Sequence, residues 1–402
     1  MPNTQINTFL NTAYAMLTGK ADVDALSTAQ IIDVGAATIS ANKEQFFGSL
    51  INVMMKNVFP DAEYEPTEND VFFVDAEQYG AIMQVISVDI PQAVSNPAWA
   101  QFVSAYDDYA NATRLHDTPV YIPVVDSRMY QSTDSWAIPL TITGEQLDTA
   151  VHNAAELEAL AARLWLSVNN AKAIHLENMD RVNRNNFIAN KVLAFRSGAA
   201  GIHKINLVQA AYEAGVIGTN ASAGDTLTAV SFLNDKDGLL FATEQIKEYK
   251  SYFKVPNSLF NTAAKVKFVP SDRLVLQVLS KFERRLETVA LLSTYHKDIL
   301  DMPLFREVAS WQGLGTDTSW SNVSKVDIAI NSEITIEQTG VVALLVDKWA
   351  IMHTTKTRRT GVDRDDIKDL IAYSVQQRDM YCNNLTLPGL VFTVEDYTIP
   401  TP

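Results

Sequence analysis

The sequence predicts an α+β fold of two or more domains, organised around one long helix. Residues 145–197 contain neither glycine nor proline, and apolar residues recur through them at helical spacing. The segment before this stretch is rich in proline, and the segments after it alternate between helix-like and strand-like patterns. A chain of 402 residues also exceeds the size at which a single hydrophobic core usually stops growing, so more than one domain is expected.

The long helix has a recognisable start signal. Thr143 can cap its first turn, where Glu145 and Asp148 place negative charge near the free backbone amides. A helix of about 40 residues would be about 60 Å long, whereas helices in globular proteins average about 11–12 residues. The alternative is a break near residues 169–170, which would give two consecutive helices of an all-α domain.

Residues 1–143 divide into two segments of different character. Residues 1–60 contain short amphipathic helical patterns joined by turns. Seven of the chain's 14 prolines fall between Pro60 and Pro139, which favours extended, loop-rich structure over residues 61–143. So long a segment is either a domain of its own or a projection that gains order from a neighbouring subunit, and we favour the second interpretation. Its expected strands are 71–74, 82–90, 120–125 and 136–142, with a polar turn at 126–134.

Residues 201–332 show the alternation of a layered α/β lobe. Short helices are expected over 205–212 and 239–253, and a strand over 266–269. Ser271 and Asp272 resemble helix caps, so a further helix is expected to continue from them through Leu279.

Residues 333–402 are rich in strands. The solidly apolar run 341–347 is typical of a buried central strand. We expect the apolar stripe of the long helix to pack on strands within 341–375. We expect three polar residues of that helix to face outside this core, namely Arg181, Asn183 and Arg184. The other expected strands are 333–338, 349–353, 371–376 and 389–394, and the basic residues Lys356, Arg358 and Arg359 are expected in the turn between two of them.

Composition and charge narrow the class of protein. Hydrophobic residues make up 47% and charged residues 20% of the chain, which is globular composition. The net charge of -15 argues against specific nucleic-acid binding, because a protein that grips phosphates carries excess Lys and Arg. The apolar runs are too short to cross a bilayer, no secretory signal is evident, and a single cysteine fits a reducing cytosol.

The sequence carries no catalytic signature. It lacks the glycine-rich phosphate-binding motifs, the GxSxG nucleophile elbow and the HExxH zinc motif, and its six histidines are scattered. We therefore assign no catalytic, cofactor-binding or metal-binding residues and expect no cofactor. Because carboxylates are plentiful, an intracellular α/β enzyme with carboxylate-based hydrolytic chemistry remains the alternative from a different class.

One electrostatic hypothesis concerns contact between subunits. Residues 61–77 contain seven acidic residues and no basic one. Acidic runs are usually solvated faces, but an acidic projecting segment could also meet a basic cluster on a neighbouring subunit. The candidate contact residues are Glu63, Glu65, Glu68 and Asp70 on one side and Lys356, Arg358 and Arg359 on the other.

Three stretches resemble the major capsid (head) proteins of tailed bacteriophages, in particular those of small short-tailed phages. The first is Val34-Gly35-Ala36 followed by residues 42–58, which is similar to the arm helix of that group. The second is LETVALLSTYHKDILDMPLFREVASWQGLG at 286–315. The third is ALLVDKWAIMHTTKTRRTG at 343–361, where an apolar strand and Asp347-Lys348 lead into a basic turn.

The resemblance implies the Hong Kong phage-like capsid fold and a division of the chain. Residues 1–60 would be the N-terminal arm, which embraces a neighbour, and 61–143 the extended loop, which reaches over another. Residues 144–200 would carry the spine helix of the peripheral domain, and 201–332 the axial domain at the capsomer centre. Residues 333–402 would supply closing strands, mainly to the peripheral domain.

The implied function is a structural one: self-assembly of pentamers and hexamers into an icosahedral or prolate shell around the phage genome. The implied partners are further copies of the chain, a separate scaffolding protein and a portal, with double-stranded DNA near by but not specifically bound and no membrane. The implied location is the virion, assembled in the host cytoplasm. A bacterial shell of the same fold that encloses protein cargo is a further alternative.

Overall fold

The computed structural model describes residues 72–73, 83–90, 125–130, 133–143, 154–290, 304–313, 317–330, 332–365 and 370–401. The chain forms two compact units, each made of several segments. Unit 1 consists of Met1–Gly80, Ser132–Asn185 and Ile351–Asn383, and unit 2 of Ala81–Gln131, Asn186–Ala350 and Asn384–Pro402. The predicted arm helices, and the acidic residues Glu63, Glu65, Glu68 and Asp70, lie outside the described residues.

The predicted long helix is a single helix, α5, which spans Ala154–Arg196 and has 43 residues. It passes through residues 169–170 without a break, so the two-helix alternative is wrong. The helix ends just before Gly198, which adopts a φ of +69° that residues with a side chain rarely adopt. The amides of Gly198 and Ala199 bond back to the carbonyls of Phe195 and Ala194, at 3.1 and 3.0 Å, and so close the last turn.

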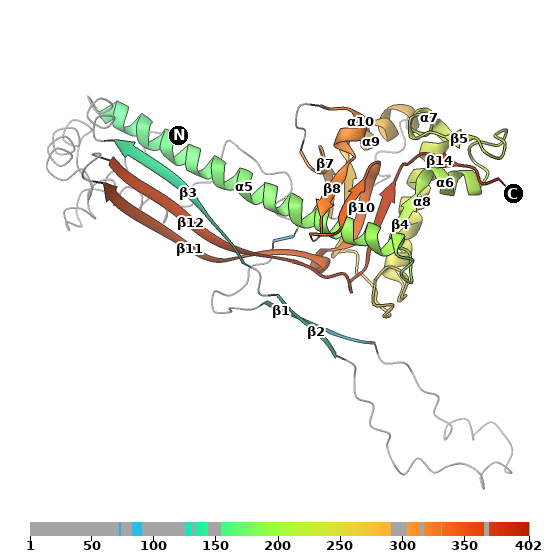
Figure 1. The fold of residues 1–402 in the computed structure, drawn as a ribbon, viewed down its shortest axis with the longest axis horizontal. Helices are drawn as coiled ribbons and strands as arrows, with labels where there is room; N and C mark the ends of the chain where they lie inside the picture. The colour runs from blue at the N-terminus through green and yellow to red at the C-terminus, as the bar shows by residue number, and fades with distance from the viewer. Residues whose placement is uncertain are drawn as a thin grey trace, which may run out of the picture. The chain divides into compact units, whose positions relative to one another are not determined.

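Unit 1 contains a three-stranded antiparallel sheet of order β11-β12-β3 (Figure 1). The strands are β3 (Thr133–Thr143), β11 (Ile351–Asp365) and β12 (Leu370–Asn383). The predicted strands at 136–142 and 371–376 are confirmed, and both are longer than predicted. The part of α5 that belongs to unit 1 lies along one face of this sheet, where Asn183 Nδ2 donates to the carbonyl of Met352 at 3.2 Å.

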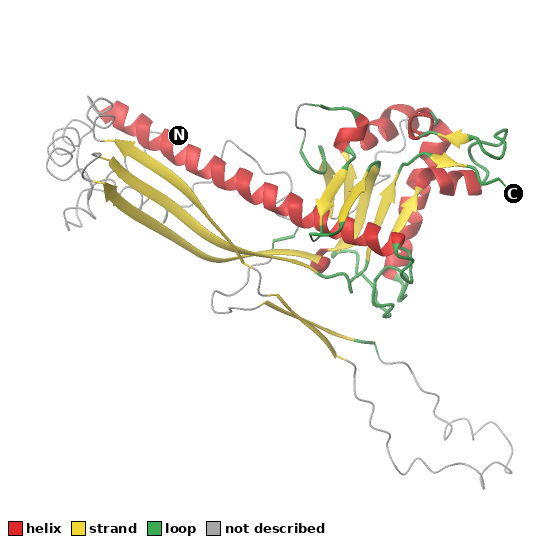
Figure 2. Cartoon of the chain, viewed as in Figure 1, coloured by secondary structure: helices red, strands yellow, loops and turns green. Residues whose placement is uncertain are grey.

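Unit 2 contains a five-stranded mixed sheet of order β4-β13-β10-β6-β7 (Figure 2). Its strands are β4 (Lys204–Asn206), β6 (Leu274–Leu279), β7 (Leu304–Val308), β10 (Val341–Asp347) and β13 (Gly389–Thr393). Strand β10 is buried at every position and lies in the centre, as its apolar run predicts. Residues 333–402 therefore contribute to both units, since β11 and β12 belong to unit 1.

The helix predicted from Ser271 to Leu279 is wrong, because residues 274–279 form strand β6. The sequence LVLQVL is buried at all six positions and pairs with β10 on one side and β7 on the other. A strand buried on both faces shows a continuous apolar run instead of alternation, so its pattern cannot be distinguished from that of a short buried helix.

The helices of unit 2 begin with local caps. Asp235 accepts a hydrogen bond from the amide of Gly238 at 3.0 Å and starts α8 (Lys236–Lys254), which confirms the helix predicted at 239–253. The strand expected at 266–269 is reduced to a single bridge between Asn257 and Lys267. The other helices are α6 (Leu207–Glu213), α7 (Ala229–Asn234), α9 (Ser280–Arg285), the π-helical turn η2 (Leu286–Ala290), α10 (Trp320–Val323) and the 3-10 turn η3 (Lys348–Ala350).

Three two-stranded pairings complete unit 2. Strand β1 (Met83–Val88) pairs with β2 (Val125–Tyr130), which confirms the predicted strand at 82–90. The predicted turn at 126–134 is wrong where it overlaps β2 and β3, because the polar sequence VDSRMY pairs with β1 along its whole length. The other pairings are β5 (Thr226–Leu227) with β14 (Tyr397–Thr398), and β8 (Val326–Ala329) with β9 (Thr335–Gln338).

Candidate subunit-contact site

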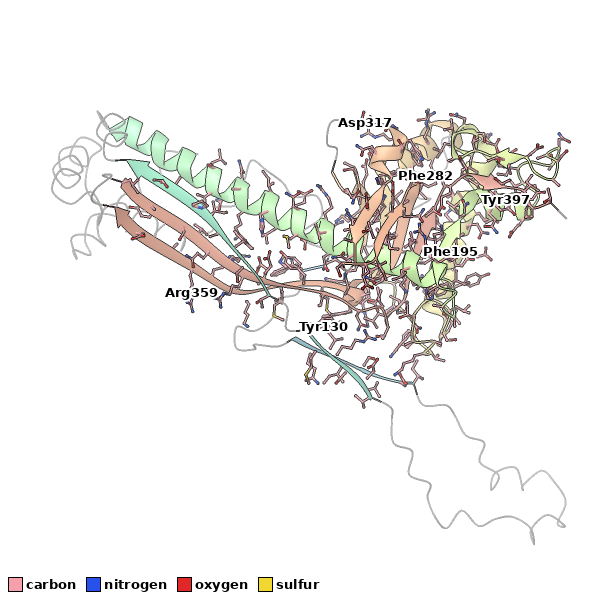
Figure 3. The ribbon with its side chains drawn as sticks, viewed as in Figure 1. Tyr130, Phe195, Phe282, Asp317, Arg359 and Tyr397 are labelled. Carbon is pink, nitrogen blue, oxygen red and sulfur yellow. The ribbon has the colours of Figure 1, made fainter. Side chains whose placement is uncertain are left out.

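The predicted basic cluster lies within strand β11, not in a turn. Its sequence HTTKTRRTG lacks apolar alternation, which resembles a loop, but threonine favours strands and pairing with β12 satisfies the backbone. Arg358 and Arg359 are exposed and Lys356 is half-buried. Because consecutive strand residues point to opposite faces of a sheet, Arg358 and Arg359 do not form one patch. The side chain of Arg359 projects from β11 in Figure 3.

A second arginine, which the sequence reading missed, shares a face with Arg359. Arg359 lies opposite Gln376 of β12, and Arg378 follows two residues later, so the two arginines are diagonal neighbours. Arg378 is exposed, as are Ser135 and Ala137 of the adjacent strand β3. This polar, basic surface, which we call the outer sheet face, is defined by Arg359, Gln376, Arg378, Ser135 and Ala137. No local signal marks Arg378, because its place beside Arg359 depends on the register between β11 and β12.

Arg358 lies on the opposite face, which packs on α5. It pairs with buried Gln377, which in turn lies opposite Trp136 of β3. The Trp136 ring lies 4.6 Å from the ring of His175 on α5, so this row of residues faces the helix. Burial, and then the charge of Arg358, lower the pKa of Lys172 on α5 to about 8.

This helix-facing side contains a cluster of buried ionisable side chains, formed by Asp180, His353 and Asp379. His353 Nδ1 lies 3.1 Å from Asp180 Oδ1, and His353 Nε2 lies 4.0 Å from Asp379 Oδ1. Asp379 also accepts hydrogen bonds from Trp136 Nε1 at 2.6 Å and Gln377 Nε2 at 2.7 Å. Burial raises the pKa of the Asp180 carboxyl, although the nearby side chains of His353 and Arg184 act in the opposite direction.

The polar residues at 181–184 of α5 correct a prediction. Asn183 and Arg184 are buried, with exposed fractions of 6% and 0%, whereas the sequence reading placed them outside the core. Asn183 is held twice, because it donates to Met352 and its own carbonyl accepts from Asn383 Nδ2 at 3.0 Å. Arg181 is half-buried and pairs with Glu177 at 3.1 Å. The apolar stripe of α5 is therefore joined by polar side chains that meet partners on the sheet.

His353 also holds the described start of the predicted extended loop. Its backbone amide donates to the carbonyl of Phe72 at 3.1 Å, and its ring lies 5.5 Å from the ring of Phe73 in an edge-on contact. The Tyr381 ring stacks on it at 4.8 Å. One side chain thus connects α5, β12 and the segment that contains Phe72 and Phe73.

Unit 2 has buried charges of a different kind. Arg273 pairs with Asp347 at 2.5 Å, and Asp347 in turn accepts from the amide of Trp349 at 3.1 Å. Lys191 of α5 is fully buried, and its Nζ donates to the carbonyl of Phe260 at 2.8 Å. Burial lowers the pKa of Lys191 to about 7. Unlike the cluster in unit 1, these groups occur as one ion pair and one isolated lysine.

None of these groups forms a recognisable catalytic or metal centre. Within the ranges that the structure describes, no three or more His, Cys, Asp or Glu side chains are arranged to hold a metal ion. No helix in the same part of the chain is both long and apolar enough to span a membrane. The buried polar side chains described above pair with groups of their own unit.

The fold of the chain is that of a solved phage capsid protein. The chain is similar to the protein in a solved capsid structure of Staphylococcus phage Andhra, with a TM-score of 0.51 and 9% identity, covering 86% of this chain and 91% of that one. It is also similar to the protein in a capsid structure of the cyanophage P-SCSP1u, with a TM-score of 0.48 and 10% identity, covering 84% and 90%. No curated protein matches the sequence.

The sequence identifies the family within that class. The profile of the family described as Phi29-like phage major capsid protein matches residues 6–393, so this chain belongs to that family. It is a structural, shell-forming component of a phage virion, and the resemblance drawn from the sequence is confirmed.

Proposed function

We propose that this chain, together with a scaffolding protein and a portal, assembles in the host cytoplasm into the closed shell that encloses the phage's double-stranded DNA, and that it has no enzymatic activity. The observation that carries the proposal is the family match over residues 6–393. The net charge of -15 is consistent with a wall that encloses packed DNA without adhering to it.

The segments have different proposed roles in the shell. Residues 1–60 embrace one neighbour as an arm, and residues 61–143 extend over another. Residues 144–200 and 201–332 supply the peripheral and axial domains, and residues 333–402 supply the closing strands. The two compact units are consistent with a two-domain subunit, although residues 333–402 are shared between them.

Electron microscopy of the purified chain, with and without a candidate scaffolding protein, tests the proposed function. Closed shells or capsomer rings are expected. Nuclease-protected DNA inside shells recovered from infected cells would separate a genome shell from a shell for protein cargo. A chain that stays monomeric under all conditions and hydrolyses a substrate would contradict the proposal.

We further propose that the acidic residues Glu63, Glu65, Glu68 and Asp70 contact the outer sheet face of a neighbouring subunit. The supporting observation is that Arg359 and Arg378 are exposed on this face. Of the candidates Lys356, Arg358 and Arg359, it is Arg359 that lies on this face beside Arg378, and Arg358 lies on the other.

Charge reversal tests this contact. The double variant Arg359→Glu with Arg378→Glu should reduce the yield of shells, and replacing the four acidic residues with lysine should restore it. The single variants Arg359→Glu and Arg358→Glu form the matched pair, because they make the same change on opposite faces of the sheet, and only the first should reduce the yield. Equal yields from the double variant and the wild type would remove the proposal while leaving the shell-forming function intact.

A further inference from the structure

The ring of His353 lies between two buried carboxyl groups that belong to different elements. Asp180 of α5 and Asp379 of β12 have their nearest oxygens 3.1 Å from Nδ1 and 4.0 Å from Nε2. The exposed fractions are 2% for His353, 5% for Asp180 and 0% for Asp379. Among the described residues, neither ring nitrogen and neither oxygen of Asp180 has a hydrogen-bond partner. Electrostatic attraction is therefore the main interaction that these atoms can make.

This arrangement favours an additional proton. A neutral imidazole has a lone pair on one ring nitrogen, which would here lie next to a carboxylate oxygen, whereas the protonated ring has an N–H group on both nitrogens. Two ionised carboxylates would also bury two negative charges close together. A proton on the ring or on Asp180 removes both conflicts. Burial and the charge of Asp379 both raise the pKa of the Asp180 carboxyl, which acts in the same direction.

Other ionisable groups come from the elements that pack around these three side chains. They are Lys172, His175, Arg184 and the Glu177–Arg181 ion pair on α5, Asp134 on β3, Arg358 on β11 and Tyr381 on β12. Phe72 and Phe73 add no titratable group. The charge of Arg184 favours the ionised form of Asp180, so it opposes the additional proton. Burial lowers the pKa of Lys172 to about 8, so Lys172 is a competing source of pH dependence.

The same histidine attaches Phe72 and Phe73 to the edge of the sheet of unit 1. Its amide donates to the carbonyl of Phe72 at 3.1 Å, and its ring contacts the ring of Phe73. Phe73 and His353 form an isolated parallel bridge, whereas β3 pairs with β12 along its whole length. In the part of the chain that the structure describes, the attachment of Phe72 and Phe73 to the sheet is therefore confined to one residue of β11, and a small change at that residue can shift it.

We propose that one proton shared by His353 and Asp180 keeps Phe72 and Phe73 attached to β11, and that loss of this proton at alkaline pH releases them. The attached form holds one proton more than the released form, in which both side chains have their ordinary affinity for protons. Above about pH 6.5, the ordinary pKa of histidine, attachment should therefore weaken by up to about tenfold per pH unit, until the attached form also loses the proton. The inference concerns the single chain, so it does not depend on shell formation.

Hydrogen exchange of the His353 backbone amide tests this switch, because that amide bonds to Phe72 across the edge of the sheet. Mass spectrometry at single-residue resolution would follow its protection in the full-length chain from pH 6.5 to 9, corrected for the intrinsic pH dependence of exchange. We expect protection to fall at least about tenfold. Amides of β10 in unit 2 are the internal reference and should not lose protection. Constant protection at His353, or an equal loss in β10, would overturn the inference.

Substitutions identify the groups that hold the proton. His353→Gln cannot carry it, so exchange of the amide at this position should become independent of pH. His175→Gln is the matched control, because it makes the same change at a half-exposed histidine of α5, and it should keep the wild-type fall. If His353→Gln does not fold, as judged by circular dichroism, Asp180→Asn takes its place and should reduce the fall to less than about threefold. A wild-type fall in either variant would overturn the inference.

Lys172→Met separates the competing source of pH dependence. If the shared proton controls the attachment, this variant should keep the fall in protection between pH 6.5 and 9, because it leaves His353 and Asp180 in place. A variant that loses the fall would assign the pH dependence to Lys172 and overturn the inference. Because every measurement is made on single chains, each of these outcomes leaves the proposed shell-forming function unaffected.

Discussion

The two sheets of this protein are buried with different chemistry. In unit 2, strands β6, β10 and β13 are buried at every position, and nearly all their residues are apolar. In unit 1, the interface between α5 and the sheet of β3, β11 and β12 buries Asp180, Arg184, His353 and Asp379. One chain thus builds one helix–sheet interface with charges and another sheet almost entirely without them.

This difference suggests different roles for the two kinds of burial: apolar side chains stabilise the fold, and buried ionisable groups determine which packing arrangement is adopted. Each buried large apolar side chain contributes roughly 1.5–3 kcal/mol, and many packings of similar volume achieve this. Buried charges lose hydration and add little net stability, but each needs a particular partner. The pairing of Asp180 on α5 with His353 on β11 is satisfied in only one position of the helix on its sheet, and so is the hydrogen bond from Asn183 to Met352. We infer that unit 2 supplies most of the stability and that the charges of unit 1 fix the position of α5.

The largest effect is expected from breaking the apolar sheet. Leu344 is fully buried in β10, between β13 and β6. Leu344→Ala should lower the free energy of unfolding by about 2–5 kcal/mol, because a cavity remains where the side chain was. Urea unfolding followed by circular dichroism measures this. Leu240→Ala, at a position of α8 that is 38% exposed, is the control, and an equal loss in both variants would contradict the comparison.

A double-mutant cycle tests the charged interface. Asp180→Leu or His353→Phe alone should lower the free energy of unfolding by about 1–3 kcal/mol, because each leaves the other buried group without its partner. The double variant should lose less than the sum of the two, with a coupling of about 0.5–3 kcal/mol. The same urea titrations on the four proteins give the coupling, and additive losses would show that the pair does not act as a unit.

Lys191 is a buried ionisable side chain in the mostly apolar core of unit 2, and its burial should make the free energy of unfolding depend on pH. Burial lowers its pKa to about 7 in the folded protein, from the value of 10.5 that a water-exposed lysine has in the unfolded chain. Between these values the unfolded chain holds a proton that the folded chain lacks, so the free energy of unfolding should rise with pH, by at most about 1.4 kcal/mol per pH unit. Below pH 7 both states are protonated and this contribution to the pH dependence vanishes.

Lys191→Met should remove this rise with pH. Unfolding free energies measured at pH 7, 8 and 9 would show a smaller slope for the variant than for wild type. Lys254→Met, at an exposed position in the last turn of α8, is the control and should keep the wild-type slope. The same slope in both variants would mean that Lys191 is not neutral in the folded protein at pH 9.

The last test measures the reaction rate of the single cysteine, Cys382. Cys382 is buried in unit 1, and burial raises the pKa of its thiol to about 12. Because the thiolate is the reactive form, a disulfide reagent at pH 8 should modify the folded protein at least about a hundredfold more slowly than the unfolded chain. Asp180→Leu should speed the reaction more than Leu344→Ala does if unit 1 opens separately from unit 2. Equal acceleration would show that the two units open together.

Sequence reasoning succeeded where a local pattern decides the structure. The absence of glycine and proline predicted α5, and the apolar run at 341–347 predicted the buried strand β10. It failed where contacts with residues distant in the sequence determine the secondary structure or the burial of a segment. Ser271 and Asp272 resembled caps, but pairing with β10 and β7 makes 274–279 a strand. Asn183 was assigned to the surface because its partners, Met352 and Asn383, lie well over a hundred residues away.

The candidate contact site was predicted in part. Arg359 is exposed as expected, but the sequence grouped it with Arg358, which strand geometry places on the other face. Arg378 was missed because it lies beside Arg359 only through the register between β11 and β12, and no local sequence pattern specifies that register. The acidic partners, Glu63, Glu65, Glu68 and Asp70, lie outside the described residues, so that half of the site stays a prediction.

The interleaving of the two units constrains how the protein is made. Each unit takes its strands from both the middle and the end of the chain, since β12 completes the sheet of unit 1 and β13 joins β4 to β10 in unit 2. The sheet of unit 1 needs β12, which ends at Asn383, and the sheet of unit 2 needs β13, which ends at Thr393, so until then β10 and β6 are apolar strands without their full set of neighbours. Truncation before residue 370, which removes both strands, should therefore yield insoluble chains, not a smaller folded unit.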